Sequence, residues 1–149
     1  MRLVPLVGAL AAALATCVPA FAEVRLPAER WTIPYTGGDI NMPACNSETV
    51  LSKIQSRFSQ TQQTYWNSDR QLVAFDDVHP LGFRTWGLDF IPRLFCTGKV
   101  PVSDGRWHRI DFSVIEDGGI IGYTWGVDWC VTGYDLEHAY APGCKMARP

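Results

Sequence analysis

Two turn signals between residues 90 and 134 constrain the fold of this chain more than any other feature. Asp117-Gly118 lies between alternating apolar residues, and this dipeptide is typical of a two-residue hairpin because both turn positions need a positive φ. Ser103-Asp104-Gly105 suits a three-residue loop whose glycine is left-handed. The segment is therefore expected to form three antiparallel strands joined by two tight turns.

These turns also fix an expected register. Centring them on Asp104 and on Asp117-Gly118 places Cys96 opposite Phe112, and Phe112 opposite Tyr123. Because strand side chains alternate between faces, a slip of one residue would exchange the two faces. The expected apolar face holds Leu94, Cys96, Ile110, Phe112, Val114, Ile121, Tyr123 and Trp125. The polar face holds Arg93, Thr97, Lys99, Arg109, Asp111, Ser113, Thr124 and Asp128.

Residues 46–66 carry a clear helical pattern. Asn46 or Ser47 can cap the first turn, and Glu48 lies where the helix dipole favours an anion. The apolar stripe of this helix needs a partner, and the apolar face of the sheet is available. The stripe holds Val50, Leu51, Ile54, Phe58, Thr61 and Tyr65. The predicted fold class is α+β, with one amphipathic helix on a twisted antiparallel sheet of four to five strands.

Shorter segments flank this unit. Residues 71–76 and 82–86 are strand candidates separated by a loop through His79-Pro80. Residues 23–44 are interrupted by prolines and glycines, which predicts an extended arm, with an edge strand over residues 30–35 as the alternative.

The N-terminus has the features of a secretory signal peptide. An apolar run is followed by Ala20-Phe21-Ala22, which predicts cleavage before Glu23. The competing interpretation is lipidation of Cys17, although the preceding threonine fits a lipoprotein signal poorly. The expected organisation is a signal peptide over residues 1–22, the arm over residues 23–44, and a single α+β domain over residues 45–149 with a disulfide-tied tail. The expected location is periplasmic or secreted, without a membrane span.

Four cysteines remain under either interpretation. An even set in an exported chain predicts two disulfides rather than a metal site, and four cysteines allow three pairings. Alternation along the last strand turns Cys130 away from the face of Cys96. Cys45 precedes the helix that covers that face, so the favoured pairs are Cys45–Cys96 and Cys130–Cys144.

Charge and motifs exclude several classes of function. The chain has 13 basic and 15 acidic residues without a basic run, which argues against nucleic acid as a partner. Sequence patterns for a nucleophile elbow, a zinc protease and a phosphate-binding loop are absent. No cofactor and no metal is expected.

Asp76-Asp77-Val78-His79 is the pattern that best suits catalysis. Carboxylates beside an imidazole could serve as a general base, but turn chemistry before Pro80 explains the same residues. Asp76, Asp77 and His79 are thus weak catalytic candidates for an alternative function, a small cell-envelope hydrolase. A structural accessory subunit is a further alternative.

Tryptophans gather around the expected sheet at positions 86, 107, 125 and 129. Exposed tryptophans form platforms for sugars or protein partners. The expected register buries Trp125 and Tyr123, whereas Trp107 and Trp129 lie at strand ends and are the ligand-binding candidates. The leading prediction is a non-catalytic periplasmic protein that binds an envelope protein or glycan.

Five runs of the chain are distinctive, and three of them contain a cysteine. They are RLFCTG (93–98), SDG (103–105), IEDG (115–118), VDWCVTGYD (127–135) and AYAPGC (139–144). These runs resemble a family of small exported proteins of Gram-negative bacteria that has no assigned activity. The resemblance covers most of the chain from Cys45 onward, implies a periplasmic, disulfide-bonded domain and transfers no catalytic residue.

Overall fold

The computed structural model of this protein describes residues 42–84 and 91–149. The expected signal peptide, nearly all of the N-terminal arm and Trp86 lie outside the described residues. Within the described ranges, no helix has both the length and the apolar character needed to cross a membrane.

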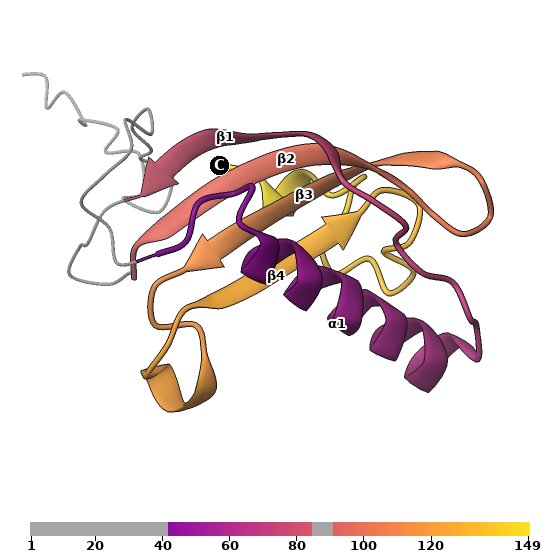
Figure 1. The fold of residues 1–149 in the computed structure, drawn as a ribbon, viewed down its shortest axis with the longest axis horizontal. Coiled ribbons are helices and arrows are strands. Elements are labelled where there is room, and N and C mark those ends of the chain that lie inside the picture. Colours follow the sequence, from indigo (N-terminus) through magenta and orange to yellow (C-terminus); the bar gives the residue numbers. More distant parts are fainter. Residues whose placement is uncertain (1–41, 85–90) are drawn as a thin grey trace, which may run out of the picture.

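One helix packs on a four-stranded antiparallel sheet, which is the expected α+β class (Figure 1). The strands lie in the sheet in their order along the chain, β1-β2-β3-β4. Each strand therefore pairs with its neighbours in sequence, and β1 and β4 are the two edges. The elements are α1 (Glu48–Trp66), β1 (Asp76–Arg84), β2 (Arg93–Pro101), β3 (Trp107–Ile115), η2 (Ile120–Gly122), β4 (Gly126–Val131) and η3 (Lys145–Ala147).

The helix α1 covers one face of the sheet with residues spaced four apart. Val50, Ile54 and Phe58 are buried, and Gln62 extends this row. The helix ends where Asn67 takes the left-handed conformation, at φ 46°. Tyr65 was expected in the buried stripe, but it is 73% exposed. The last turn of α1, which contains Tyr65, extends beyond the end of β4 (Figure 1).

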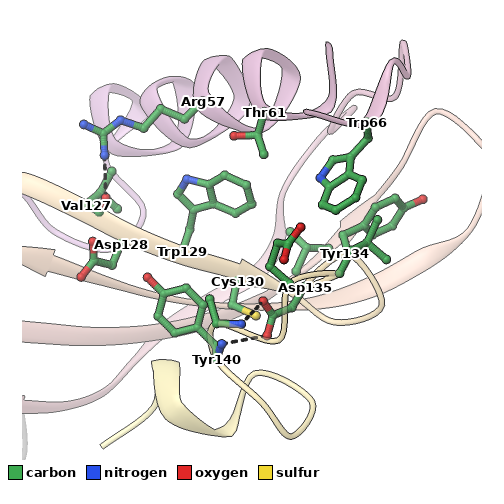
Figure 2. Close-up of a pocket in the computed structure, with 14 residues that line it drawn as sticks. Arg57, Thr61, Trp66, Val127, Asp128, Trp129, Cys130, Tyr134, Asp135 and Tyr140 are labelled. Atoms are coloured by element: carbon green, nitrogen blue, oxygen red, sulfur yellow. Dashed lines mark hydrogen bonds between the residues drawn. The ribbon is translucent and has the colours of Figure 1, made fainter. Parts of the chain in front are cut away.

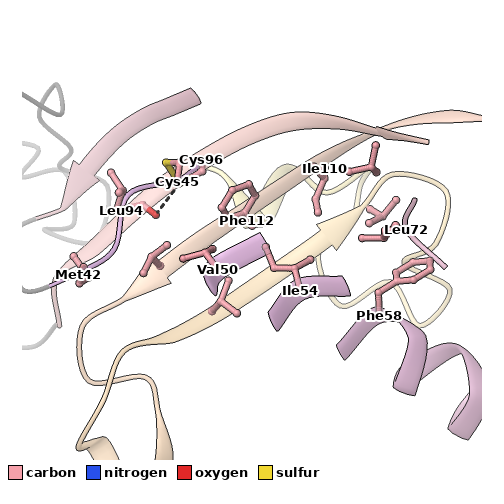
Figure 3. Close-up of a cluster of buried hydrophobic side chains, with 14 of the residues drawn as sticks. Met42, Cys45, Val50, Ile54, Phe58, Leu72, Leu94, Cys96, Ile110 and Phe112 are labelled. Atoms are coloured by element: carbon pink, nitrogen blue, oxygen red, sulfur yellow. Dashed lines mark hydrogen bonds between the residues drawn. A yellow bond between two sulfur atoms is a disulfide. The ribbon is translucent and has the colours of Figure 1, made fainter. Parts of the chain in front are cut away.

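The apolar face of β2 and β3 forms the centre of the core (Figure 3). Cys96 pairs with Phe112 as expected, and both side chains are fully buried. Val102 N–H donates to the Arg106 carbonyl at 2.9 Å, so the first turn also has the expected register.

The expected two-residue hairpin between β3 and β4 is wrong. Phe112 pairs with Trp129 instead of Tyr123, because β4 begins only at Gly126. A turn does form after Ile115, whose carbonyl accepts from Gly118 N–H at 3.3 Å. The chain then leaves the sheet, and residues 116–125 form a longer loop between the strands.

Two glycines allow this loop to return to the sheet. A Cβ on Gly126 would collide with the backbone of Gly118, so the two chain segments cross at a contact that a side chain would block. The pairing partner of Phe112 lies six residues later than expected. Because six is an even number, the residues of β4 still alternate between the faces as expected. Val127, Trp129 and Val131 take the places expected for Ile121, Tyr123 and Trp125.

One long edge strand replaces two expected short strands. β1 includes His79-Pro80, which was expected in a loop, and its pairing with β2 is irregular on both sides of this pair. Proline is tolerated here because β1 is an edge strand. The strand expected over residues 71–76 is reduced to an isolated bridge between Leu72 and Val102, and only Asp76 belongs to β1.

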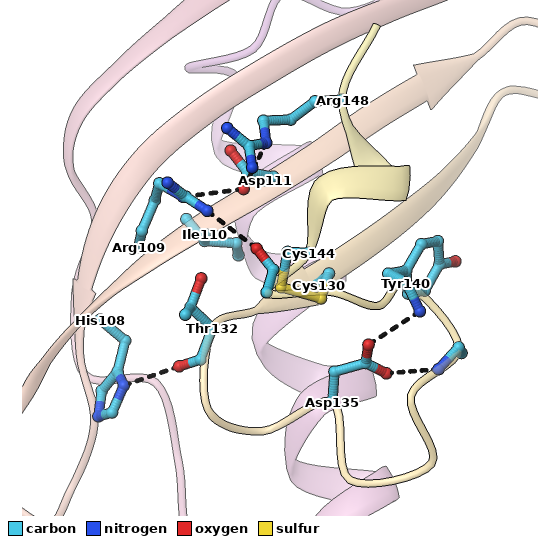
Figure 4. The surroundings of a disulfide bond; sticks show 12 residues. His108, Arg109, Ile110, Asp111, Cys130, Thr132, Asp135, Tyr140, Cys144 and Arg148 are labelled. Atoms are coloured by element: carbon cyan, nitrogen blue, oxygen red, sulfur yellow. Dashed lines mark hydrogen bonds and ion pairs between the residues drawn. A yellow bond between two sulfur atoms is a disulfide. The ribbon is translucent and has the colours of Figure 1, made fainter.

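The polar face of the sheet is covered by the C-terminal segment (Figure 4). The fully buried Asp111 accepts from Thr97 Oγ1 at 2.8 Å and from Arg109 Nε at 2.9 Å. Arg148 Nε, from the end of the chain, lies 3.5 Å from the same carboxylate. Arg109 also donates to the Gly143 carbonyl at 2.9 Å, so this network holds the C-terminal segment on β3.

Two disulfides reinforce this arrangement, and they are the pairs favoured from the sequence. Cys45–Cys96 joins the chain before α1 to β2, and Cys130–Cys144 joins β4 to the C-terminal segment. Each covalently attaches a covering segment to one face of the sheet.

Removing the disulfides is expected to destabilise the domain unequally. The sequence separations are 51 for Cys45–Cys96 and 14 for Cys130–Cys144, and chain entropy then predicts losses of about 4 and about 3 kcal/mol. Denaturant unfolding of the paired alanine variants measures this order. An equal or reversed order would show that strain or residual denatured structure outweighs loop length.

Replacing Asp111 is expected to loosen the C-terminal segment. Asp111→Asn removes a charge-assisted acceptor from a fully buried position, which should lower the free energy of unfolding by about 2 kcal/mol. Tryptic cleavage after the exposed Lys145 should become faster. Asp69→Asn, at an exposed position after α1, serves as the control and should change neither measurement.

Candidate functional site

A groove with a volume of about 310 Å³ runs along the outer edge of β4 (Figure 2). The C-terminal half of α1 forms one wall, and the segment after β4 forms the other. The lining residues are Arg57, Thr61 and Trp66 of α1, Val127, Asp128, Trp129, Cys130 and Val131 of β4, and Tyr134, Asp135, Leu136, Glu137, Ala139 and Tyr140 of the C-terminal segment.

Four aromatic side chains line the groove: Trp66, Trp129, Tyr134 and Tyr140. Trp129 packs on Phe58 with ring centroids 5.6 Å apart, and Tyr134 meets the same phenyl ring at 5.4 Å. Because Phe58 is fully buried, these two rings rest on the core and have little freedom to move. This part of the groove is therefore a preformed aromatic surface.

The two tyrosines remain neutral donors at physiological pH. Burial raises the pKa of the Tyr140 phenol, and the nearby carboxylate of Asp128 raises it further. Burial likewise raises the pKa of Tyr134, whose hydroxyl donates to Asp104 Oδ2 at 3.0 Å.

Carboxylates outnumber cations along the groove, with Asp128, Asp135 and Glu137 against Arg57. Arg57 donates to the Val127 carbonyl at 2.8 Å and thus ties α1 to the edge of β4. Asp128 is paired with Arg93, so Asp135 and Glu137 are the carboxylates that favour a ligand with positive charge.

Asp135 shapes the wall opposite α1. Its two carboxylate oxygens accept from the backbone N–H groups of Ala139 and Tyr140, at 2.9 and 2.8 Å. This carboxylate therefore closes the loop that brings Tyr140 to the groove (Figure 2). Asp128 is paired with Arg93, at 3.0 Å, across the polar face.

The structure separates the two tryptophans that were predicted to bind a ligand. Trp129 lines the groove, whereas Trp107 is 60% exposed at the start of β3 and is not among the lining residues. Trp125, expected in the core, is half-buried, and its ring is covered by Lys53 Nζ at 4.4 Å from the centroid. Trp66 and Tyr140 were not predicted as site residues, because neither lies in a sequence pattern that marks a site.

The weak catalytic candidates lie on β1, at the opposite edge of the sheet from the groove. His79 Nδ1 is 2.7 Å from the Asp77 carbonyl oxygen and 3.5 Å from Asp77 Oδ1. Both side chains are about half exposed, at 51% and 55%, and Lys99 Nζ lies 3.2 Å from the other oxygen of Asp77. Asp76 is exposed too. This open arrangement does little to desolvate or orient a general base. A catalytic role for Asp76, Asp77 and His79 therefore stays a prediction.

Among the described residues, no three histidine, cysteine, aspartate or glutamate side chains are grouped so that they could hold a metal ion. His108 of β3 is instead engaged in the fold. Its Nδ1 lies 2.9 Å from the Thr132 carbonyl oxygen, and its ring meets Tyr134 edge-on at 5.0 Å.

A second surface feature is the apolar tip of the loop between β3 and β4. This loop projects away from the body of the domain (Figure 1). Ile120, Ile121 and Tyr123 are 81%, 98% and 89% exposed. The expectation that Ile121 and Tyr123 are buried is therefore wrong, since they belong to this loop and not to β4. Ile121 also has a φ of 57°, which is unfavourable for a β-branched side chain.

Relieving this strain is expected to stabilise the domain. Ile121→Asn places a residue that tolerates the left-handed conformation at a position that buries almost nothing, which should add about 1 kcal/mol to the free energy of unfolding. Thermal unfolding should shift upward by roughly 4 °C. Ile120→Asn is the matched control, because Ile120 is exposed without a positive φ. An equal gain in both variants would instead point to exposed apolar surface as the cause.

No protein-family model matches the chain, and no curated protein and no solved structure matches it. The resemblance to a family of small exported proteins therefore stays a prediction. The features that bear on function are those of this chain itself: two disulfides, an aromatic groove beside an open strand edge, and a projecting apolar loop.

Proposed function

We propose that this protein is a non-catalytic binding protein of the periplasm, and that the groove along β4 holds part of an envelope protein or glycan. The observation that carries the proposal is the preformed aromatic surface of Trp129 and Tyr134, which rests on buried Phe58. Rigid aromatic side chains in a concave site lose little entropy on binding and commonly dominate the binding energy.

The proposed location has two supports. The signal-like sequence before Glu23 predicts export. Two disulfides in a domain of this size are typical of an oxidising compartment.

The alternative, an envelope hydrolase that uses Asp76, Asp77 and His79, has less support. A general base and its substrate need a shared concave site that excludes water. These three residues are exposed on an edge strand, and none of them lines the groove. The distribution of the aromatic and the titratable groups therefore favours binding over catalysis.

Truncating the aromatic groove is expected to abolish partner binding. Trp129→Ala and Trp66→Ala should each weaken binding by about 2 kcal/mol or more, or roughly thirtyfold. The probes are periplasmic extract, followed by identification of the captured protein, and oligosaccharides released from the cell envelope. Circular dichroism checks that each variant is folded.

Trp107→Ala and His79→Ala are the controls for this experiment. Both side chains are exposed and lie outside the groove, so both variants should bind like the wild type. If His79→Ala alone abolishes complementation of a deletion phenotype while the folded tryptophan variants retain it, the hydrolase alternative replaces the binding proposal.

A further inference from the structure

We propose that the partner segment held by the groove is an extended peptide that adds to β4 as a fifth strand of the sheet. This inference rests on the proposed function and names the chemistry of the ligand. It follows from the backbone groups on the free edge of β4, from a contrast between the two edges of the sheet, and from the side chains that flank the edge.

The register of β3 and β4 shows which backbone groups face outward. Thr132 N–H donates to the Arg109 carbonyl at 2.9 Å, so this pair exchanges hydrogen bonds across the two strands. In an antiparallel ladder every second residue does so, and the residues between direct their N–H and C=O groups away from the partner strand. On β4 the outward residues are Val127, Trp129 and Val131.

Contacts from outside the sheet agree with this assignment. Arg57 donates to the Val127 carbonyl and Lys53 to the Trp125 carbonyl, and both acceptors belong to the outward set. The Val131 carbonyl accepts from Tyr134 N–H at 2.9 Å. Among the described residues, the N–H and C=O of Trp129 and the N–H of Val131 have no hydrogen-bond partner. These groups are the donors and the acceptor that an added strand requires. Trp129 is half-buried, whereas Val131 is only 1% exposed, so a peptide can reach the Val131 N–H only from inside the groove.

The two edges of the sheet differ in how they resist strand addition. β1 contains Pro80 and pairs with β2 through two irregularities, and both features discourage a further strand. β4 contains no proline, and its pairing with β3 is regular from Gly126 to Val131. The edge without these two features is also the one that lines the groove, where Trp129 lies between the occupied carbonyls of Val127 and Val131.

The walls of the groove define the side chains of the peptide. Trp129, Thr61 and Trp66 lie on the α1 side of β4, whereas Asp128 and Tyr140 lie on the side of the C-terminal segment (Figure 2). Side chains of an added strand alternate between these walls. The expected peptide has apolar or aromatic residues at alternate positions and basic residues between them, and its paired part covers about four residues or roughly 13 Å around Trp129.

The backbone of Trp129 distinguishes this occupant from a glycan. A sugar ring can stack on the indole without any hydrogen bond to the strand edge. A peptide in strand conformation instead offers one residue whose N–H and C=O both meet those of Trp129. Dependence on the strand edge is therefore the property to test.

The test begins with a displayed library of random peptides of about twelve residues, selected on the full mature protein. Peptides with alternating apolar and basic residues are the expected result. Binding of these peptides is then compared between Val131→Pro and Val131→Ala. Val131 is a core residue, so both substitutions remove buried side-chain contacts. Proline also removes the outward N–H, whereas alanine keeps it, and neither substitution removes a hydrogen bond to β3. The proline variant should bind about tenfold more weakly than the alanine variant, or worse.

A second measurement leaves the protein unchanged, in case the proline variant does not fold. Selected peptides are synthesised with single N-methyl groups along the backbone. Methylation at every second position should abolish binding, and methylation between these positions should be tolerated, because only alternate amides of a strand face β4. Protection of the Trp129 and Val131 amides from hydrogen exchange should appear when the peptide binds.

Three results would overturn the inference: no enriched peptide, equal binding by the proline and alanine variants, or an N-methyl pattern without alternation. If envelope oligosaccharides bind in a manner that depends on Trp129 while every peptide fails, the groove remains a binding site and only the peptide inference is lost. If neither class of ligand depends on Trp129 or Trp66, the proposed function fails as well.

Discussion

The pairing of β3 with β4 is the constraint on which most of this structure depends. It places Trp129 opposite Phe112 and turns its indole toward α1. It also releases residues 116–125 from the sheet, which exposes an apolar loop. Because side chains alternate, a register displaced by an odd number of residues would have put Cys130 toward α1 and separated it from Cys144. The groove, the exposed loop and the second disulfide thus share one cause.

Both faces of the sheet are covered, and each cover is attached by a disulfide. On one face, α1 buries an apolar stripe against β2 and β3. On the other face, the C-terminal segment covers polar residues, so its attachment relies on the buried carboxylate of Asp111 and on Cys130–Cys144. The two covers end beside β4 without meeting over its edge. The groove is the space between them, which explains why it contains the free edge of a strand.

Much of the central sheet could be predicted from the sequence, but the candidate site could not. The register of β2 and β3 follows from a short turn and from alternation, which are local properties. The Asp117-Gly118 signal was misleading, because the turn that forms there does not resume a strand. The close contact between Gly118 and Gly126 permits the longer loop, and it joins positions that no local pattern connects. Trp66 and Tyr140 reach the groove from distant elements, so periodicity carried no information about them.

The sequence by itself determined the fold class, the amphipathic helix, the first hairpin and the disulfide pairs, because alternation, helical spacing and cysteine positions report directly on which face a residue occupies. Only the tertiary structure decided which strand edge stays open and which aromatic side chains converge on it. That outcome depends on where α1 and the C-terminal segment end relative to β4. Such a relation between separate elements arises from packing and has no signature in any one stretch of the chain.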